Sequence, residues 1–515
     1  MNELPTSWIE ATVGELFETA GGGTPSTTVP EYWRGTIPWI SSADIDDMHH
    51  MSISRFISEN AIRDSATNLV PAGSVIVVTR VGLGKVSVAE GPLCFSQDHQ
   101  ALLIDPKHFD TKYVLYFMSQ AVKSFKQISR GTTISGVTKK QLLETNFTLP
   151  PRPEQTRIVA EIEKQFTRLD AATAALKRVQ ANLKRYRASV LKAACEGRLV
   201  PTEAELARKE GRDYEPADKL LQRILRERRA RWEADTLAKM QASGKPPTDD
   251  SWKQKYKEPS APDTSNLPEL PKGWCWTTVE QVGFVQLGRQ RAPQHHQGKN
   301  MRPYLRVANV FEDRIDTADM KTMNFTPAEF VQYKLEVGDI LLNEGQSFEL
   351  VGRPAMFRGE VDNCCFQKTL LRFRPSNLIE GDFALTVFLT YLNNGTFQKV
   401  TRRTTTMAHL TAERFLTMAF PLPPIEEQRR VVRLAHEALS RMSRLQLELV
   451  QAHEKGASLR RSTLAGAFSG TLVPQDPTDE PASVLLERIR AGRGSQDNQK
   501  PSGRARRAAA SKEKS

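Results

Sequence analysis

Apolar residues recur at spacings of three and four along two long stretches of the chain, about 154–195 and 427–468. This spacing predicts two long helices, each with one apolar stripe. Such a stripe needs a partner, so we expect the two helices to pair as an antiparallel coiled coil. The alternative is that each helix packs on its own globular domain. The expected pairing residues are Ile158, Ile162, Phe166, Leu169, Leu176 and Leu183 in the first helix, and Leu439, Met442, Leu445, Leu449 and Leu459 in the second.

A mixed segment of about 150 residues precedes each predicted helix. It contains short β-type runs, such as "SVIVVTRV" and "DILLNE", separated by Gly, Pro and Asp. Each segment ends at a Leu-Pro-Pro break, and each helix stops at a Gly-x-Leu-Val-Pro sequence. These are sound signals for the start and the end of a helix.

The order of elements occurs twice along the chain. "LPTSWIEATVGEL" from Leu4 returns as "LPKGWCWTTVEQV" from Leu270, and "LPPRPEQTRIV" from Leu149 returns as "LPPIEEQRRVV" from Leu422. The pairs that start at 131 and 404 and at 149 and 422 share an offset of 273 residues. This period is too long for a solenoid, so the repeat indicates a duplication that gave a pseudo-two-fold monomer.

The sequence therefore predicts an α+β protein with two mixed α/β domains separated by two long antiparallel helices. The expected boundaries are a first domain at 1–150, the first long helix at 151–201, a connector with a basic helix and a Pro-rich linker at 202–266, a second domain at 267–423, the second long helix at 424–474, and a short helix with a disordered basic tail at 475–515.

Charge and cysteine content narrow the class of protein. Lys and Arg total 72 against 60 Asp and Glu, which gives a formal net charge of +12 and a pI of about 9.4. This excess of positive charge favours a polyanionic partner, foremost a nucleic acid. The five cysteines have no zinc-type spacing and are expected to be reduced core thiols. No signal peptide and no membrane span is predicted, so we expect a cytoplasmic protein.

The stretch "GGGTPSTTVPEYW" at 21–33 raises the question of a phosphate-binding loop. The second half reads "LGRQRAPQ" at the corresponding place, so the glycine triplet is not shared. A variable loop in which glycine allows close backbone approach is the better interpretation. Because no Walker A, GxGxxG, HExxH or GxSxG sequence is present, and the histidine pairs at 49–50 and 295–296 lack further ligands, we predict no catalytic residue and no metal site.

A set of short motifs, in this order, resembles the specificity subunit of type I restriction–modification systems over nearly the whole chain. The second half departs from the pattern by lacking the glycine triplet. In the first half the motifs are Gly22-Gly23-Thr24-Pro25-Ser26, Glu31-Tyr32-Trp33, Pro38-Trp39, Asp44, Gly131-Thr132-Thr133, Leu149-Pro150-Pro151, Glu154-Gln155 and Gly197-Arg198-Leu199; in the second half they are Trp274, Pro303-Tyr304, Asn309, Leu422-Pro423-Pro424 and Glu427-Gln428.

The resemblance implies a non-catalytic DNA-recognition subunit. Each globular domain is then a target-recognition domain that reads one half of a bipartite site in double-stranded DNA. The paired helices set the unread spacer and dock methyltransferase subunits, with two expected, and restriction/translocase subunits join them. This chain would bind no cofactor; S-adenosylmethionine belongs to the methyltransferase partner, which flips out an adenine and methylates it, and ATP belongs to the motor/nuclease partner.

Two loops at matching positions, "SRGTTISGVTKK" and "TRRTTTMAHLT", are basic and rich in hydroxyl groups, as a DNA contact requires. The alternative is a solvated loop with ordinary surface charge. The DNA-binding candidates are Arg80, Lys85, Arg130, Thr132, Thr133, Ser135 and Lys139 in the first half, and Arg289, Arg291, Arg306, Arg353, Arg402, Arg403, Thr405, Thr406 and His409 in the second.

Other interpretations stay open from the sequence. The connector arginines Arg226, Arg228, Arg229 and Arg231 fit a solvated helix face better than a contact with DNA or a partner. A coiled-coil scaffold that assembles proteins without reading DNA is the main rival to the DNA-recognition function. A self-sufficient nuclease or methyltransferase is disfavoured because catalytic motifs are lacking.

Overall fold

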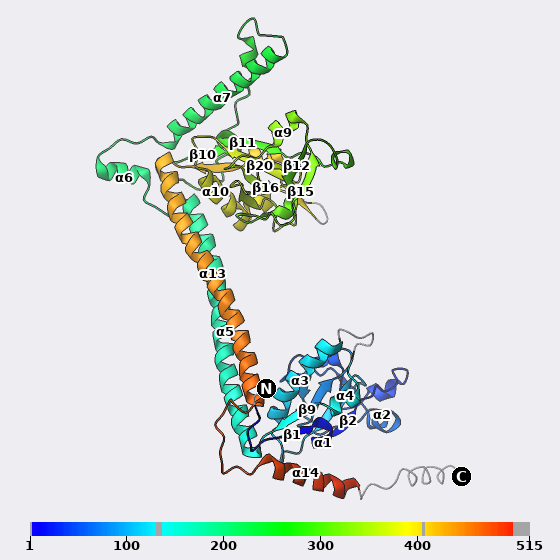
Figure 1. Cartoon of the computed structure of the whole chain (residues 1–515). Coiled ribbons are helices and arrows are strands. Elements are labelled where there is room, and N and C mark those ends of the chain that lie inside the picture. Colours follow the sequence, from blue (N-terminus) through cyan, green and yellow to red (C-terminus); the bar gives the residue numbers. More distant parts are fainter. Residues whose placement is uncertain (1–2, 130–135, 404–406, 498–515) are drawn as a thin grey trace. The chain divides into compact units, whose positions relative to one another are not determined.

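The computed structural model describes residues 3–129, 136–403 and 407–497. The chain forms two compact units, one from residues 1–176 with 451–515 and the other from 177–450. Each unit therefore combines one mixed domain with part of each long helix (Figure 1). Among the described residues, no helix has both the length and the apolarity needed to cross a bilayer.

The first unit is built on two small sheets and a strand pair. A four-stranded antiparallel sheet has the order β2-β8-β5-β6, and a three-stranded sheet has the order β4-β3-β7, in which β3 and β7 are parallel. Strands β1 and β9 pair antiparallel and join the two ends of the domain. The strands are β1 (Ile9–Thr12), β2 (Glu18–Gly21), β3 (Ile37–Ile40), β4 (Arg55–Ile57), β5 (Val75–Val78), β6 (Val86–Val88), β7 (Cys94–Phe95), β8 (His99–Leu103) and β9 (Asn146–Leu149).

The second unit has the same strand order. Its four-stranded sheet runs β11-β20-β16-β18, its three-stranded sheet runs β15-β12-β19, and β10 pairs with β23. It adds the pair β13-β14 and a small sheet β17-β22-β21. The strands are β10 (Cys275–Thr278), β11 (Gly283–Leu287), β12 (Met301–Leu305), β13 (Val310–Phe311), β14 (Arg314–Ile315), β15 (Lys321–Asn324), β16 (Ile340–Asn343), β17 (Gly345–Gln346), β18 (Pro354–Met356), β19 (Cys365–Phe366), β20 (Leu370–Pro375), β21 (Arg402–Arg403), β22 (Ala408–His409) and β23 (Ala419–Leu422).

Short helices cover these sheets. In the first unit they are α1 (Val13–Leu16), η1 (Pro30–Trp33), η2 (Ser42–Asp44), α2 (Glu59–Asp64), α3 (Thr111–Ser129) and α4 (Lys139–Leu143); in the second they are α8 (Val279–Val282), η4 (Pro293–His295), η5 (Val307–Asn309), α9 (Pro327–Tyr333), α10 (Gly381–Asn393), α11 (Thr396–Val400) and α12 (Ala412–Leu416).

The continuous apolar runs of the sequence form the central strands β5 and β16, which are buried on both faces. All four residues of β5 are buried, with Val75 and Val77 in one hydrophobic cluster and Ile76 and Val78 in another. Since successive side chains of a strand point to opposite faces, a strand covered on both sides needs an unbroken apolar run.

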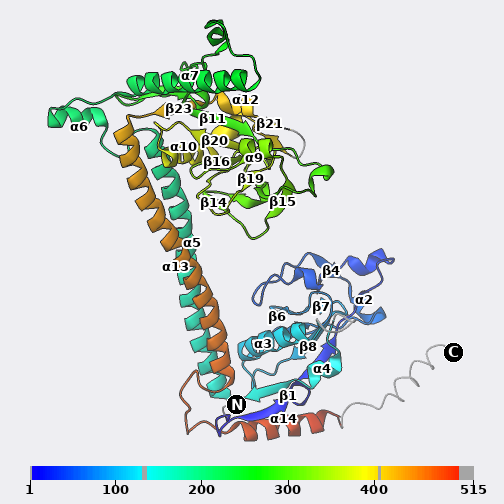
Figure 2. The same ribbon diagram turned by 45° about the horizontal axis from the view of Figure 1, so that its top comes forward.

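The two long helices are α5 (Arg152–Cys195) and α13 (Ile425–Phe468), each of 44 residues. Within each unit their segments lie side by side (Figures 1 and 2). At its start α5 packs on its own domain, where Ile158, Ile162 and Phe166 are buried in the first unit's core. Farther along, Leu183 and Met442 are buried in the second unit, and Leu169, Leu176, Leu439 and Leu449 are half-buried.

Two of the predicted pairing residues do not fit the seam, by which we mean the strip of buried and half-buried side chains between α5 and α13. Leu445 and Leu459 are 45% and 48% exposed, which corrects their assignment to it. At about 100° per residue, Leu445 lies roughly 60° around the helix from the buried Met442, and Leu459 roughly 140° from the buried Leu464. A pair of helices buries only a narrow strip of each, so spacing by threes and fours includes residues at its edges and beyond.

A shorter helix follows each long one and packs against the unit that it reaches. In the second unit this helix is α7 (Ala217–Ala242), which follows α6 (Glu203–Glu210) and precedes η3 (Ser251–Lys255). It buries Ala217, Leu220 and Ile224. In the first unit, α14 (Ala482–Asp497) buries Leu485, Leu486 and Ile489, and the Ala482 amide donates to the Ser7 carbonyl over 2.9 Å. The tail predicted to be disordered lies mostly outside the described residues.

The glycine stretch after β2 is a site of close backbone packing. A Cβ on Gly22 would lie 2.1 Å from the Ser96 carbonyl oxygen, and one on Gly23 would lie 2.5 Å from the Ala66 carbonyl carbon. The Gly23 carbonyl also accepts a hydrogen bond from the Trp39 indole over 3.0 Å. In the second unit a Cβ on Gly288 would lie 2.2 Å from the Gln367 carbonyl oxygen. Packing within the domain therefore accounts for these glycines.

We predict that Gly22→Ala and Gly288→Ala each lower the free energy of unfolding by about 1–3 kcal/mol, because the new methyl group overlaps backbone atoms that cannot rotate away. Urea unfolding followed by fluorescence measures this. Gly91→Ala is the matched control, since its Cβ would meet nothing within 4 Å. Equal midpoints for all three variants and the unchanged protein would contradict the packing role.

Candidate nucleic-acid interface and helix junctions

The first turn of each long helix carries a buried Glu-Gln pair, and the glutamine fastens the helix to its domain. The Gln155 side chain accepts from the Asp110 amide over 2.8 Å and donates to the Pro150 carbonyl over 3.2 Å. The Gln428 side chain does the same with the Glu380 amide and the Pro423 carbonyl, both over 3.0 Å. Each glutamine therefore ties its helix start to the residue just before α3 or α10.

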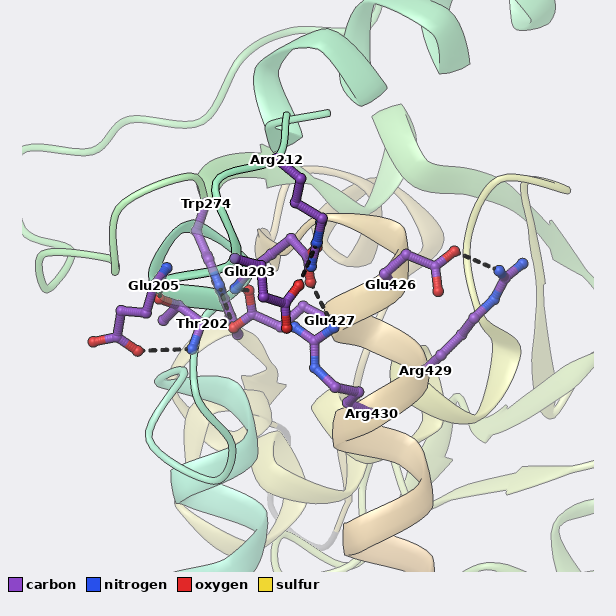
Figure 3. Close-up of polar contacts among 10 residues, drawn as sticks. Thr202, Glu203, Glu205, Arg212, Trp274, Glu426, Glu427, Arg429 and Arg430 are labelled. Carbon is purple, nitrogen blue, oxygen red and sulfur yellow. Dashed lines mark hydrogen bonds and ion pairs between the residues drawn. The ribbon is translucent and has the colours of Figure 1, made fainter. Parts of the chain in front are cut away.

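In the second unit the partner glutamate, Glu427, is fully buried and receives two hydrogen bonds (Figure 3). The Trp274 indole donates to it over 2.9 Å and the Glu203 amide over 2.8 Å. Burial raises the pKa of Glu427, although these two donors favour the carboxylate. The junction thus joins the start of α13, the first strand region of the domain and the chain that follows α5.

Two arginines surround the same junction. Glu203 forms ion pairs with Arg212 at 2.6 Å and Arg430 at 2.5 Å (Figure 3). Burial acts to raise the pKa of Glu203, but the hydrogen bonds from Arg212 and Arg430 outweigh it and hold the pKa below its usual value. The two arginines therefore keep Glu203 charged and offset the repulsion between its carboxylate and that of Glu427.

The first unit contains the corresponding junction around Glu154. The Trp8 indole donates to Glu154 over 3.0 Å, and the Gln475 side chain donates over 2.7 Å. Burial raises the pKa of Glu154 as well. The same glutamate position thus binds an indole from its own domain and a donor from the segment that follows the other long helix.

We predict that Trp274→Phe destabilises the second unit by about 1–3 kcal/mol, because it leaves a buried carboxylate oxygen without its donor. The pKa of Glu427 is already raised, and removal of the indole raises it further. A raised folded-state pKa gives stability that is full below the unfolded pKa and lost as pH rises through the folded pKa. The destabilisation is therefore larger at neutral pH than at mildly acidic pH.

Urea unfolding at both pH values measures this difference. The control is Trp276→Phe, whose indole donates to the Pro268 carbonyl at the surface over 3.0 Å. This variant should lose less stability, with no dependence on pH in that range. A decrease for Trp274→Phe that is the same at both pH values would show that the indole acts only by filling space.

The candidate DNA-binding residues of the first unit gather around the loop after β5. The Val137 amide donates to the Thr79 carbonyl over 2.7 Å, which places the Gly136–Lys139 segment beside this loop. Arg80 has 63% of its side chain exposed and lies 4.0 Å from Asp98, and Lys139 is exposed. Val81, next to Arg80 in the chain, is exposed and offers an apolar contact that the sequence did not single out. Arg130, Thr132, Thr133 and Ser135 lie outside the described residues.

Lys85 belongs to the same loop but turns inward. Its Nζ donates to the Ser42 carbonyl over 2.9 Å and the Ile45 carbonyl over 2.7 Å. These bonds hold the loop after β3 in place. The prediction that Lys85 contacts DNA is therefore replaced by a structural role for this side chain.

The second unit brings the corresponding segments together in its small three-stranded sheet. Strand β22 pairs with β17 and with β21, so that His409 lies opposite both Gly345 and Arg402. The His409 Nδ1 lies 3.3 Å from Glu344 Oε1. The described parts of the two basic loops, Gly136–Lys139 and strands β21 and β22, thus lie beside the segment after the central strand in each unit. Thr405 and Thr406 lie outside the described residues.

Three other arginine candidates are engaged within the second unit. Arg289 is buried, binds Glu329 through hydrogen bonds of 2.8 and 2.9 Å, and stacks on Phe325. Arg306 pairs with Asp319. Arg353 stacks on Phe311, and burial lowers its pKa. Its bonds to Glu329 remove the buried Arg289 from the set available to DNA, whereas Arg306, Arg353 and the exposed Arg291, which donates to His296 over 3.0 Å, stay in it.

Within residues 3–129, 136–403 and 407–497, no group of three or more His, Cys, Asp or Glu side chains gathers in a way that would hold a metal ion.

Comparison with known proteins agrees with the repeated organisation. A family described as "Type I restriction modification DNA specificity domain" matches residues 5–184 and again residues 273–452. The chain is 21% identical over 514 residues to the type I restriction enzyme EcoDI specificity subunit of Escherichia coli, covering 97% of this chain and 98% of that protein.

Other relatives match over shorter segments. The MjaIX specificity subunit of Methanocaldococcus jannaschii is 30% identical over 164 residues, 31% of this chain and 38% of that subunit. The EcoR124I/EcoR124II specificity subunit of Escherichia coli is 31% identical over 183 residues, 34% of this chain. The matched segment spans 45% of that second relative, so the chain matches less than half the length of each of these two.

Among solved structures, one titled as the structural basis of complex assembly and conformational transition of the type I R-M system covers 92% of this chain and all of that one. Its TM-score is 0.63 at 17% identity, so this likeness concerns the fold.

Proposed function

Because the chain belongs to the family of type I restriction modification DNA specificity domains, we propose that it is the non-catalytic DNA-recognition subunit of a type I restriction–modification complex. The observation that carries this proposal is the doubled family match, with one domain in each half. In each of these halves the described part of a basic loop also lies beside the segment after the central strand.

Two recognition domains imply a bipartite site in double-stranded DNA. The shared strand order and shared Glu-Gln junctions support an origin by duplication. Different loop sequences on one scaffold would read different half-sites. In the first unit the candidate reading surface is Arg80, Val81 and Lys139 with the 130–135 loop, and in the second it is Arg291, Arg402, Arg403 and His409 with the 404–406 loop.

The long helices are the proposed ruler and docking surface. As an antiparallel coiled coil they would fix the unread spacer between the half-sites. Several apolar side chains stay exposed on them within the second unit, which is unusual for a helix that faces only water. They are Val179 and Tyr186 on α5 and Leu434, Leu445, Leu447 and Val450 on α13. We assign this surface to methyltransferase subunits, two in number, with restriction/translocase subunits joining the complex in the cytoplasm.

The chemistry of the complex is assigned to its other subunits. S-adenosylmethionine would be bound by the methyltransferase subunits and ATP by the motor/nuclease subunits, while this chain binds no cofactor. Its own contribution is then to select the DNA sequence and to hold the methyltransferase over its target adenine.

We predict that deletion of the gene from its host removes one bipartite methylated-adenine motif from the genome. Sequencing of methylated bases in the two strains measures this and gives both half-sites and the spacer. Re-expression of the chain should restore the same motif. Unchanged methylation in a host whose methyltransferase is active would contradict the recognition function and favour a scaffold that does not read DNA.

We also predict that Arg402→Ala with Arg403→Ala weakens DNA binding by the assembled methyltransferase and lowers the salt dependence of log K by about 0.9 for each phosphate that is no longer neutralised. Fluorescence anisotropy on a labelled duplex that contains the site measures this. Lys239→Ala with Lys272→Ala is the control, because it removes equal charge from exposed positions elsewhere in the unit. Unchanged affinity at moderate salt would exclude the β21 segment from the interface.

A further inference from the structure

The helix α7 extends well beyond the part that the fold buries. Its buried residues, Ala217, Leu220 and Ile224, lie in the first third, and the helix continues past them to Ala242 (Figure 1). The chain then returns through η3. Trp252 of this return segment is buried and stacks with Trp232 of α7, with ring centroids 5.9 Å apart. The extension is therefore an ordered addition to the second unit and not a loose linker.

A groove of about 720 Å³ lies between this extension and the sheet. Arg228 and Arg231 line it from α7, Lys255 and Lys257 from the return segment, and Arg372 and Arg374 from strand β20. Asp235 is the acidic residue among those that line it. Six cations thus face the groove from three different elements, whereas the sequence alone suggested a solvated helix face.

Acidic neighbours compensate only some of these charges. Arg374 binds Asp339 at 2.6 Å, Arg372 lies 3.9 Å from the same carboxylate, and Arg228 lies 3.9 Å from Glu280. The remaining cations, Arg231, Lys255 and Lys257, are exposed and form no ion pair with residues that the structure describes. The groove consequently keeps an uncompensated positive charge on both of its walls.

The α7 guanidinium groups are held in place by an aromatic ring. Arg228 and Arg231 lie over the Phe284 ring, at 4.6 and 5.4 Å from its centroid. Arg228 also donates to the Gly283 carbonyl over 2.9 Å. Planar guanidinium groups fixed by stacking lose little freedom when they bind an anion, and their donors match the geometry of phosphate oxygens.

The floor of the groove carries unused hydrogen-bond donors. Arg372 is 8% exposed; it donates to the Lys334 carbonyl over 3.0 Å and to the Gln286 side-chain oxygen, while its Nε has no partner. The Gln286 amide nitrogen also has no partner. Buried donors without acceptors are costly, and an anion or its bridging water would supply the missing acceptors.

The apolar faces near the groove are already covered. Phe284 lies under two arginines, and Trp232 packs against Trp252 and Tyr256, with centroids 5.9 and 5.3 Å away. A protein partner anchors itself by burying apolar side chains in such places, so the groove offers little to an acidic peptide beyond charge. A nucleic-acid backbone needs only the charge and the donors.

We propose that this groove binds the phosphodiester backbone of DNA as a contact separate from the recognition loops. The inference rests on the proposed recognition function, because that function brings duplex DNA to the second unit. The contact is independent of base sequence. It adds affinity and salt dependence, and it leaves the recognised sequence unchanged.

The test uses the full chain in its methyltransferase complex and a labelled mixed-sequence duplex of roughly 40 base pairs, about four helical turns. Binding is measured by anisotropy between about 50 and 200 mM salt. The triple variant Arg231→Ala, Lys255→Ala, Lys257→Ala should bind more weakly, with a salt slope smaller by about 2–3, since each phosphate left without its cation reduces the slope by about 0.9. Lys255→Glu with Lys257→Glu, at two exposed positions with no packing role, should weaken binding further.

The control variant Lys239→Ala, Lys245→Ala, Lys272→Ala removes the same charge from exposed positions outside the groove and should keep the slope of the unchanged complex. An unchanged salt slope for both groove variants would overturn the proposal. Groove variants that bind DNA normally but fail to assemble with the methyltransferase would also overturn it, because the groove would then bind an acidic protein. Failure of the recognition function gives a different result: the unchanged complex would then fail to prefer its methylated motif over mixed-sequence DNA.

Discussion

The hydrogen bond between a buried glutamate and an indole, made once in each unit, is the contact on which the arrangement of helix and domain depends. Glu154 with Trp8 and Glu427 with Trp274 lie where a long helix leaves its domain. A buried carboxylate is costly unless its oxygens are satisfied, so each glutamate tolerates few positions of its neighbours. One oxygen binds the domain and the other binds the segment after the opposite helix, through Gln475 or the Glu203 amide. This fixes the direction in which each helix starts.

A recognition subunit with variable loops needs such a junction. The loops proposed to read DNA differ in sequence between the two units, "SRGTTISGVTKK" in the first and "TRRTTTMAHLT" in the second. The frame that presents them keeps the same strand order, the same packing of glycine against backbone, and the same Glu-Gln pair. Specificity can then change in a loop while the geometry of the helix start stays constant.

Local patterns in the sequence identified much of this frame, because they report local physics. Leu-Pro-Pro followed by Glu-Gln marked the start of both long helices to within two residues, and the apolar run at Val75–Val78 marked a strand buried on both faces. The orientation and contacts of single side chains depended on partners far away in the sequence. Lys85 turns inward because two carbonyls of the β3–β4 connection accept hydrogen bonds from its ammonium group. Arg289 binds Glu329, which lies forty residues away in the chain. The spacing that included Leu445 in the seam could not show how narrow the seam is.

The hydrogen bond between the Ala482 amide and the Ser7 carbonyl has a consequence for the order of folding on the ribosome. The second unit is a single stretch, 177–450, whereas the first is made of 1–176 and 451–515. During synthesis, at about 5–20 residues per second, the second unit has all its residues before the first has its last helices. The surface of the nascent first domain that α13 and α14 cover therefore stays open until translation is nearly finished. A chain truncated before residue 451 would release a complete second unit joined to a first unit that has an exposed core.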